Sequence, residues 1–430
     1  MIDIKLLRES PELVKENIKK KFQNDKLKLV DEVLELDSKW RGEKKKADDL
    51  RSGRNKISEQ INQLMKKGKK NEATGLIKQA KEIPEEIANI EEGMKKLVEE
   101  IGEKMMKIPN IMHESVKIGK DASENKVIKV VGKPLVPKFE VFNHADLLEK
   151  FGMMDRDSSR KTSGNGFYYL KGDLARLHSA VLAYARDFMI ENGYQYVVPP
   201  FMIRSDVVTG VMSAGDIDTM MYKIEGEDLY LIGTSEHSLI GMFKEKTLGK
   251  NEVPQKITSY SPCFRKEKGA HGLEEKGLYR VHQFEKQEMV IVCEPEDSYK
   301  FYDEMLKLSV EFFKTLDIPV RIFECCSGDL GDLKAKSADV EAWSPRQKKY
   351  FEVGSCSNLT DAQARRLGIK INGGKGNYYA HTLNNTVVAS PRALIALIEN
   401  NQNKDGSINI PKALQPYMGK VKKIGVVGKK

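Results

Sequence analysis

The stretch YSPCFRKEKGAHGLEEKGLYRVHQFEKQEMVIV, residues 260–292, decides the fold of this chain. Its two ends are rich in the residues that form β-strands, and its middle contains Gly269, Gly272 and Gly277. Two strands separated by a glycine-containing loop form a hairpin, so the stretch predicts a long hairpin.

The returning strand of this hairpin carries an unusual face. Side chains alternate along a strand, so every second residue lies on one side of the sheet. A guanidinium, carboxylates and an aromatic ring on one face would suit a ligand that has a phosphate, an amine and a planar base. The alternative is a solvated face with cross-strand ion pairs. The residues expected on this face are Arg280, His282, Phe284, Lys286 and Glu288, with Arg265 and Glu267 on the partner strand.

This hairpin resembles motif 2 of the class II aminoacyl-tRNA synthetases, in its seryl-tRNA synthetase form. The resemblance is carried by FRKE, the glycine-containing loop and YRVHQFEKQE. The resemblance implies that Arg265 holds the amino-acid carboxylate and the α-phosphate of ATP. It implies that Glu267 contacts the adenine amino group and that Phe284 stacks on the adenine ring. Glu288 would bind the serine substrate.

The composition limits the class of protein. The chain has 430 residues, enough for two or three domains, and a net charge of +9 that favours a polyanionic partner. Its five cysteines include no CxxC pair, which argues against a disulfide framework and favours a cytoplasmic setting. The first residues lack the apolar core of a signal peptide, and no apolar run is long enough to span a membrane.

Residues 1–108 are expected to form a helical domain. Apolar residues in a four-three spacing recur in two segments separated by KKGKKNEATG, a pattern that predicts an antiparallel coiled-coil hairpin. Glu43 and Arg54 interrupt the first seam, and Pro84 should kink the second helix or mark a broken first turn. The apolar positions run from Leu29 to Leu64 and from Leu76 to Ile101.

The turn of this hairpin is strongly basic. Lys66, Lys67, Lys69 and Lys70 surround Gly68, and a basic projection with few aromatic residues suits contact with a phosphate backbone. The alternative is a coiled coil that serves only for dimerisation. Seryl-tRNA synthetases are similar in layout, since their N-terminal helical hairpin grips the long variable arm of tRNA(Ser).

After the arm, residues 109–140 are rich in turn formers and are expected to be a linker. Residues 141–430 are then expected to form the catalytic domain, an antiparallel sheet flanked by helices. A long helix and a strand that ends at Pro199 and Pro200 resemble motif 1, which implies a homodimer.

LYLIGTSEHSLIGMF, residues 229–243, predicts a strand, a short loop and a helix. Thr234 or Ser235 could cap that helix, and Glu236 suits its first turn. The seryl family has a Thr-Ser-Glu loop here that closes over the ammonium group of the amino acid. The resemblance therefore assigns Thr234 and Glu236 to serine binding.

KSADVEAWSPRQKKYFEVGSCSN, residues 336–358, predicts two further strands. In the family the positions of Glu352, Ser355 and Asn358 line the ATP site, and Glu352, with Ser355, implies a Mg²⁺ site. One or two carboxylates together with substrate phosphates suffice for magnesium. Cys325, Cys326 and Cys356 are expected to be buried packing residues.

HTLNNTVVASPRALIALIENNQ, residues 381–402, resembles motif 3, a strand followed by a helix whose first turn supplies an arginine. Arg392 takes that place and would hold the γ-phosphate. Pro391 replaces the usual glycine, which a helix start tolerates. Asn384 and Thr386 match positions near the serine hydroxyl in the family. Residues 420–430 form a basic tail at the end of the sequence.

The resemblance extends over essentially the whole chain and implies an α+β, class II seryl-tRNA synthetase. The implied enzyme joins L-serine to ATP as seryl-adenylate and transfers the seryl group to tRNA(Ser), with tRNA(Sec) left open. Arg265, Arg392 and magnesium would stabilise the phosphorane.

Two alternatives remain: a homologue that charges a carrier protein, and a non-catalytic nucleic-acid-binding homologue. The long arm argues against the first, and the intact site residues argue against the second.

Overall fold

A computed structural model describes residues 1–267 and 277–425 of the chain. Gly269 and Gly272 of the expected hairpin loop, and the end of the basic tail, lie outside the described residues. The chain divides into two units, of which one spans chiefly residues 2–108 and the other residues 109–430. Among the described helices, none combines the length and apolar character that a membrane span requires.

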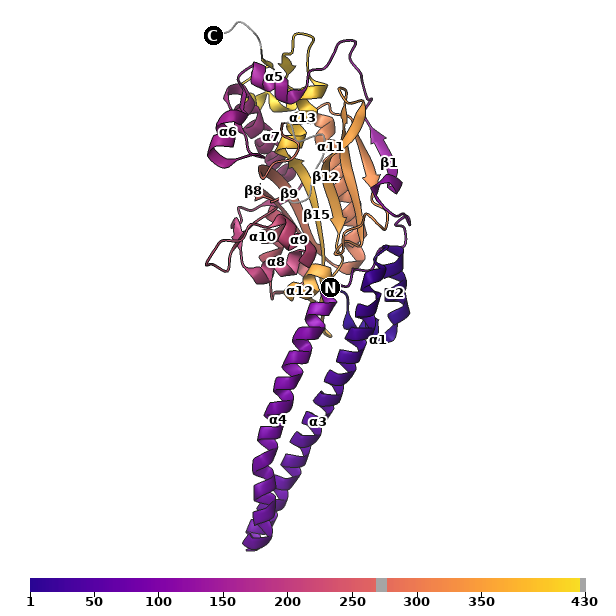
Figure 1. Ribbon diagram of the computed structural model, residues 1–430, viewed down its shortest axis with the longest axis vertical. Helices are drawn as coiled ribbons and strands as arrows, with labels where there is room; N and C mark the ends of the chain where they lie inside the picture. The colour runs from indigo at the N-terminus through magenta and orange to yellow at the C-terminus, as the bar shows by residue number, and fades with distance from the viewer. Residues whose placement is uncertain (268–276, 426–430) are drawn as a thin grey trace. The chain divides into compact units, whose positions relative to one another are not determined.

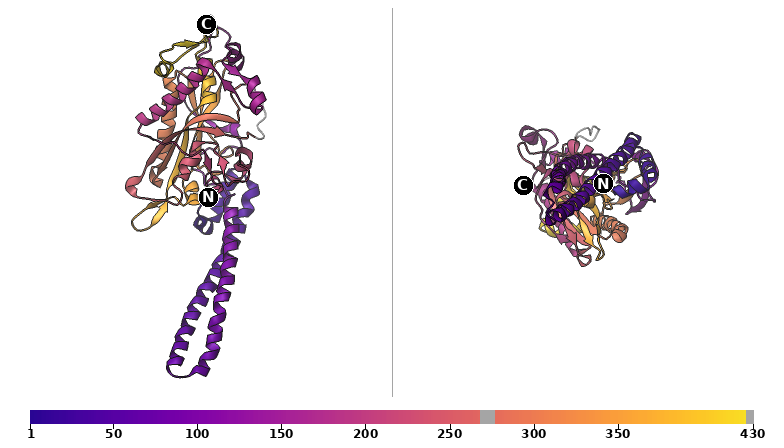
Figure 2. Two further views of the ribbon diagram at one scale, coloured as in Figure 1. Left: turned by 90° about the vertical axis from the view of Figure 1, so that its left-hand side faces the viewer. Right: turned by 90° about the horizontal axis from the view of Figure 1, so that it is seen from below.

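The first unit is a helical hairpin. Helices α3 (Leu27–Lys66) and α4 (Lys70–Met105) lie side by side and turn back on each other at Lys67–Lys69 (Figures 1 and 2). The predicted apolar seam is confirmed at Val33, Ala47, Ile83 and Ile87, which are buried. The structure also buries Val30, Asp37 and Ala73, which were not among the predicted seam positions. At 1.5 Å per residue the arms are about 60 Å and 54 Å long. Shorter elements precede them: α1 (Ile4–Glu9), α2 (Pro11–Lys20) and a 3₁₀ turn, Asn24–Lys26.

Pro84 does not break the returning helix. Helix α4 runs without interruption from Lys70 to Met105, so the expected broken turn is absent. Proline removes one backbone hydrogen bond, and its neighbours Ile83 and Ile87 are each 8% exposed in the seam. Packing on both sides of the proline holds the helix together across the missing bond.

The second unit is built on an eight-stranded sheet in the order β1-β10-β11-β12-β15-β9-β8-β4. All neighbouring strands are antiparallel except β4 and β8. The central hairpin is confirmed, since β8 pairs with β9 from Gln255–Val292 to Phe264–Gln283. The strands are β1 (Lys126–Val131), β4 (Gln195–Tyr196), β8 (Gln255–Phe264), β9 (Gln283–Cys293), β10 (Val320–Glu324), β11 (Lys336–Ser344), β12 (Lys349–Asn358) and β15 (His381–Ala389).

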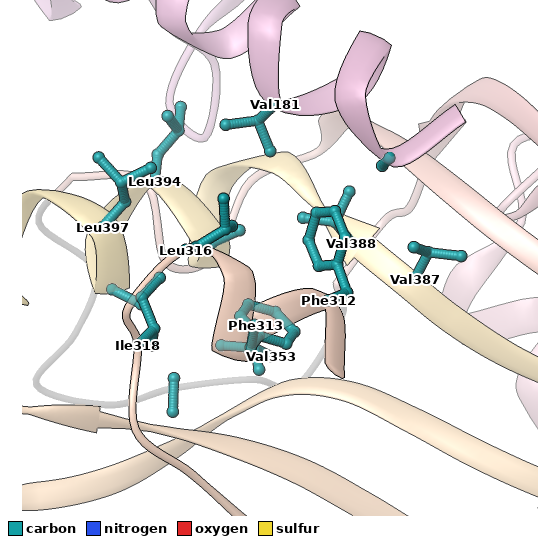
Figure 3. Close-up of a cluster of buried hydrophobic side chains, with 14 of the residues drawn as sticks. Val181, Phe312, Phe313, Leu316, Ile318, Val353, Val387, Val388, Leu394 and Leu397 are labelled. Carbon is teal, nitrogen blue, oxygen red and sulfur yellow. The ribbon is translucent and has the colours of Figure 1, made fainter. Parts of the chain in front are cut away.

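One face of the sheet carries the main core. Helices α7 (Gly172–Glu191), α11 (Ser298–Thr315) and α13 (Ser390–Asn400) contribute most of its helical residues. Figure 3 shows Val181 of α7, Phe312 of α11 and Leu394 of α13 gathered in this core, with Val388 of β15 among them. Met289 and Ile291 of β9 also point into it.

The opposite face carries a smaller core and, beside it, the candidate site. Val290 and Val292 of β9 pack there with residues of α8 (Ser205–Val211), α10 (Ser235–Gly241) and α12 (Ala362–Leu367). The alternation along β9 therefore separates the two faces. The remaining elements are α5 (His144–Lys150), α6 (Arg156–Ser163), α9 (Ala214–Met220), β2 (Met154–Asp155), β3 (Tyr169–Leu170), β5 (Met202–Ile203), β6 (Tyr230–Leu231), β7 (Thr247–Leu248), β13 (Lys370–Asn372), β14 (Asn377–Tyr379), β16 (Ile408–Asn409) and β17 (Lys423–Ile424).

The segment 109–140 is more than the linker expected from its composition. Its strand β1 pairs with β10 from Lys126–Glu324 to Val131–Val320 and forms an edge of the large sheet. Asn110 is also buried, and its side-chain amide donates to the carbonyl oxygens of Leu333 and Leu359. Turn formers around a short strand hid this pairing, because an edge strand exposed on both faces shows no apolar alternation.

Replacing Pro84 with alanine should stabilise the arm. The alanine amide restores a hydrogen bond in α4, so we expect the free energy of unfolding of the arm to rise by about 1–3 kcal/mol. The chain has two tryptophans, Trp40 and Trp343. In a Trp343→Phe background, denaturant titration followed by Trp40 fluorescence reports on the arm alone. Glu85→Ala, an exposed neighbour, is the control; an unchanged or lower stability of Pro84→Ala would contradict this account.

Candidate active site

A cavity of about 620 Å³ opens on the sheet face opposite the main core. Clefts of this size hold nucleotides and small substrates. Most of the site residues predicted within residues 141–430 converge on it, from three strands, two helix starts and a loop. Its lining includes Thr234, Glu236, Arg265, Glu267, Phe284, Glu288, Glu352, Ser355, Asn384, Thr386 and Arg392. The sequence placed these residues on one site, and the structure brings them together.

Strand β9 supplies three neighbouring positions of the cavity wall. Phe284, Lys286 and Glu288 line it, whereas Gln287 between them is fully buried on the other side. The strand face that carries site residues is shorter than predicted, because β9 begins at Gln283 and residues 280–282 precede the strand. Arg280 still lines the cavity, but His282 does not: its Nδ1 lies 3.0 Å from the carbonyl oxygen of Arg265. The prediction that His282 shares this face is therefore wrong.

Arg265 and Glu267 follow the end of β8 and lie in the cavity wall. The Nε of Arg265 donates to the carbonyl oxygen of Gly233 at 3.1 Å, and its guanidinium carbon lies 5.4 Å from the centre of the Phe284 ring. Glu267 accepts from Arg280 at 3.4 Å and has a φ of 48°. A cation, an aromatic ring and a carboxylate thus lie within one wall.

The loop before α10 performs a capping role and also enters the site. The Oγ1 of Thr234 accepts from the backbone N–H of Glu236 at 3.3 Å, which caps the helix. The same hydroxyl lies 3.1 Å from Oε2 of Glu288 and donates to it. Capping therefore fixes the position of a hydroxyl that is bonded to a buried carboxylate.

Lys286 and Glu288 form an ion pair inside the cavity, through Nζ and Oε2. Their side chains are 7% and 2% exposed. The sequence placed Lys286 on this face without giving it a role. The signal was the alternation itself, since a lysine two residues from a glutamate on one strand face lies beside it.

Glu236 lies close to Glu288 and has a different environment. Its Oε1 accepts from Nε2 of Gln363 at 2.9 Å, a neutral donor. Burial raises the pKa of Glu236 to about 7, and the negative charge of Glu288 adds to the shift. A carboxyl poised in this way is expected to ionise fully when a cation arrives beside it.

A bulge in β12 sets the opposite wall of the cavity. In the pairing with β11, Val340 opposes Gly354 and Glu341 opposes Glu352, so Val353 is the extra residue. Glu352 and Ser355 consequently both reach the cavity, although an odd spacing separates them. Burial and the neighbouring Glu352 raise the pKa of Asp339, whose strand position is opposite Ser355.

Asn358 does not line the cavity, contrary to the prediction. Its side chain is fully buried, and Oδ1 accepts from the backbone N–H of Thr360 at 2.9 Å. Ser357 lines the cavity instead. Cys325, Cys326 and Cys356 are free and buried, as predicted.

Arg392 projects from the start of α13. Pro391 lies in the first turn of this helix, where a proline is tolerated because its missing N–H would have no partner within the helix. The guanidinium donates to Oε2 of Glu352 at 2.9 Å and lies 4.6 Å from the centre of the Tyr279 ring. Tyr279 also lines the cavity and was not singled out from the sequence.

Asn384 and Thr386 enter the site from β15. Thr386 is directly opposite Glu288 in the β15–β9 pairing, and Asn384 opposes Val290. Side chains directly opposite each other on one sheet face are neighbours. Thr386 and Glu288 therefore lie together at the serine end of the expected site.

The sheet, the three motif regions and the cavity define a class II aminoacyl-tRNA synthetase. Residues 221–401 match the model of the tRNA synthetase class II core domain (G, H, P, S and T), and residues 1–112 match the model of the seryl-tRNA synthetase N-terminal domain.

Curated and solved relatives agree with these matches. A serine–tRNA ligase of Methanoculleus marisnigri is 43% identical over 421 residues, which cover 97% of this chain and 99% of the relative. The crystal structure of seryl-tRNA synthetase from Pyrococcus horikoshii complexed with ATP is 40% identical, with a TM-score of 0.93 and 99% of each chain covered. The cytoplasmic serine–tRNA ligase of Naegleria fowleri in complex with AMP has a TM-score of 0.87 at 36% identity, with 99% of this chain and 98% of that chain covered. The chain belongs to the seryl-tRNA synthetase family, and it is a ligase.

The raised pKa of Glu236 predicts a pH dependence of stability. The folded protein holds the proton more tightly than the unfolded chain, so its stability should fall as the pH rises from about 4.5 to 7. Glu236→Gln should remove this fall and, at pH 8, stabilise the protein by about 1–3 kcal/mol relative to the parent. Denaturant titrations of both proteins at pH 5 and pH 8 measure the difference. Equal pH dependence in the two proteins would contradict the assignment.

Proposed function

We propose that this chain activates L-serine with ATP to form seryl-adenylate and then transfers the seryl group to the 3′ end of tRNA(Ser). The observation that supports this most directly is the single cavity that contains Glu236, Glu288 and Arg265 beside the motif 3 arginine, Arg392. Two carboxylates suit an ammonium and a hydroxyl, and the two guanidinium groups suit a carboxylate and phosphates.

The serine subsite would lie between α10, β9 and β15. Glu236 and Thr234 would hold the ammonium group, and Glu288 with Thr386 and Asn384 would bind the hydroxyl. A site that hydrogen-bonds a hydroxyl leaves its own polar groups unpaired when alanine binds. Alanine should therefore be activated very poorly, by a factor of roughly 10⁴ less than serine.

ATP would occupy the rest of the cavity. Phe284 would stack on the adenine, Glu267 would accept from the adenine amino group, and Arg265 would bridge the serine carboxylate and the α-phosphate. The carboxylate oxygen then attacks the α-phosphorus and pyrophosphate leaves, so no covalent enzyme intermediate is needed. Arg265 and Arg392 would stabilise the charge that develops on the phosphoryl oxygens, and the fixed positions of both reactants would supply much of the rate.

The donor set also fits Mg²⁺, held by Glu352 and Ser355. Carboxylate and hydroxyl oxygens are hard ligands. Burial, and after it the negative charge of Glu352, raises the pKa of Asp339, so a cation bound in that wall would favour the ionised carboxyl group. The ion would neutralise charge on the phosphates. Glu352 accepts from Arg392 in this structure, so a cation on Glu352 would leave Arg392 available for the γ-phosphate.

The arm would supply tRNA recognition, through phosphate contacts of its tip with the long variable arm. The lysines at the tip are exposed: Lys66, Lys67, Lys69 and Lys70. We further propose a homodimer and a cytoplasmic location, and we leave open whether tRNA(Sec) is also charged. The domain roles follow: tRNA binding for residues 1–108 and catalysis for residues 141–430.

Serine-dependent exchange of pyrophosphate into ATP tests the proposal. Exchange with serine, little with threonine and almost none with alanine is the expected result. Exchange that is equal for serine and alanine would refute the roles of Glu288 and Thr386. Charging of a carrier protein in place of tRNA would favour the alternative that the arm argues against.

Phe284→Ala should weaken ATP binding selectively. Loss of one stacking contact is worth about 0.5–1.5 kcal/mol beyond the buried area, so we expect the KM for ATP to rise several-fold while the KM for serine stays nearly unchanged. Phe323→Ala is a matched control, because Phe323 is also an aromatic residue on a strand with an arginine near its ring, at 4.7 Å, but lies outside the cavity lining. A parallel rise in both KM values would place Phe284 in the core instead.

A quadruple alanine variant should separate serine activation from tRNA charging. It replaces Lys66, Lys67, Lys69 and Lys70. All of the catalytic residues lie in the other unit, so serine-dependent exchange should be unchanged while charging of tRNA falls sharply. The slope of log K against log salt for tRNA binding should shrink by as much as about 3 to 4, since four phosphate contacts are lost and each contributes close to one counterion. Replacing Lys150, Lys300, Lys307 and Lys314, exposed lysines of the catalytic unit, gives the same charge change as a control. Unaltered charging and salt slope would make the arm a structural coiled coil.

A further inference from the structure

The cavity contains two carboxylates that differ in their counterions. Glu288 is 1% exposed, and its Oε2 is bonded by the ammonium of Lys286 and by the hydroxyl of Thr234. Glu236 is bonded by the neutral amide of Gln363. One carboxylate is therefore already neutralised by a lysine, and the other has an amide as its hydrogen-bonding partner.

This difference determines which carboxylate attracts a cation. A carboxylate that is paired in a buried site gains little from a second cation, because its charge is already balanced and the second cation still loses its hydration. Glu236 has the stronger attraction for the α-ammonium group of an amino acid. Glu288 remains a hydrogen-bond acceptor, and within the described residues Thr234 and Lys286 both bond to its Oε2.

We infer that Lys286 is a specificity-determining positioning residue. It pins Glu288 through Oε2 and directs Oε1 toward a neutral hydroxyl. By balancing the charge of Glu288, it also excludes amino acids that carry a short cationic side chain. The inference rests on the proposed roles of Glu236 and Glu288 in serine binding and extends them to a residue that has no assigned role.

The competing substrate that exposes this role is 2,3-diaminopropionate, in which an ammonium group replaces the hydroxyl of serine. In the parent protein this ammonium would meet the Lys286–Glu288 pair and be repelled. Without the lysine charge, Glu288 would be an unpaired buried carboxylate, and the same ammonium group would replace the missing cation. A lysine that merely stabilises the strand would not change the preference between these two amino acids.

The test is amino-acid-dependent pyrophosphate exchange by the full-length Lys286→Met protein, with serine and with 2,3-diaminopropionate at neutral pH. We expect kcat/KM for serine to fall by about 10-fold or more, chiefly through KM for serine, with KM for ATP nearly unchanged. The ratio of kcat/KM for 2,3-diaminopropionate to that for serine should rise by about 100-fold or more. Lys286→Arg, which keeps the charge, should retain the preference for serine.

Two further variants keep the result interpretable. Lys256→Met removes a more exposed ion pair, Lys256–Glu304 at 2.7 Å, from the adjacent strand outside the cavity lining, and it should leave the ratio unchanged. Lys286→Gln retains a hydrogen-bond donor without the charge, and it should raise the ratio even if Lys286→Met does not fold.

Each outcome has a distinct meaning. An unchanged ratio in a folded Lys286→Met or Lys286→Gln protein overturns the inference, and so does an equal change in Lys256→Met. Absence of serine-dependent exchange in the parent protein would instead refute the proposed function itself.

Discussion

The alternation of side chains along β9 is the constraint on which the rest of the second unit depends. Met289 and Ile291 point into the main core beneath α7, α11 and α13, while Phe284, Lys286 and Glu288 point into the cavity. A shift of one residue would exchange these sets, burying charges in the core and exposing apolar side chains. Pairing with β8 on one side and β15 on the other excludes such a shift, so core packing also fixes the register of the site.

Local departures from regular structure complete the site around this strand. The bulge at Val353 turns Glu352 and Ser355 to the same side, and a second irregularity between Thr386 and Val388 leaves both Val387 and Val388 in the core. A bulge costs ladder hydrogen bonds but redirects a side chain. Here each bulge lies in a strand that supplies cavity residues on one face and core residues on the other.

The electrostatics of the cavity follow from unequal compensation of buried charge. Lys286 balances Glu288, whereas Glu236 has a neutral hydrogen-bonding partner, and its pKa is raised by burial and by the nearby charge of Glu288. Arg392 balances Glu352, and Asp339 beside it has a raised pKa. Each wall thus has one paired carboxylate and one whose ionisation a bound cation would favour. Such a site favours the binding of ligands that carry a positive charge, because their charge stabilises the ionised carboxylates.

The sequence by itself determined the coiled-coil arm, the central hairpin and most of the residues that line the cavity, because heptad spacing, strand alternation and the motif residues are local patterns. Thr234 illustrates this, since its capping position is visible in the chain. Only the tertiary structure decided that β1 joins the sheet, that α4 continues through Pro84 and that His282 and Asn358 lie outside the cavity. These outcomes depend on strand partners and packing that are distant in sequence. The pairing of Lys286 with Glu288, and of Glu236 with Gln363, has the same origin: which donor reaches a buried carboxylate is fixed by the folded sheet and the elements packed on it.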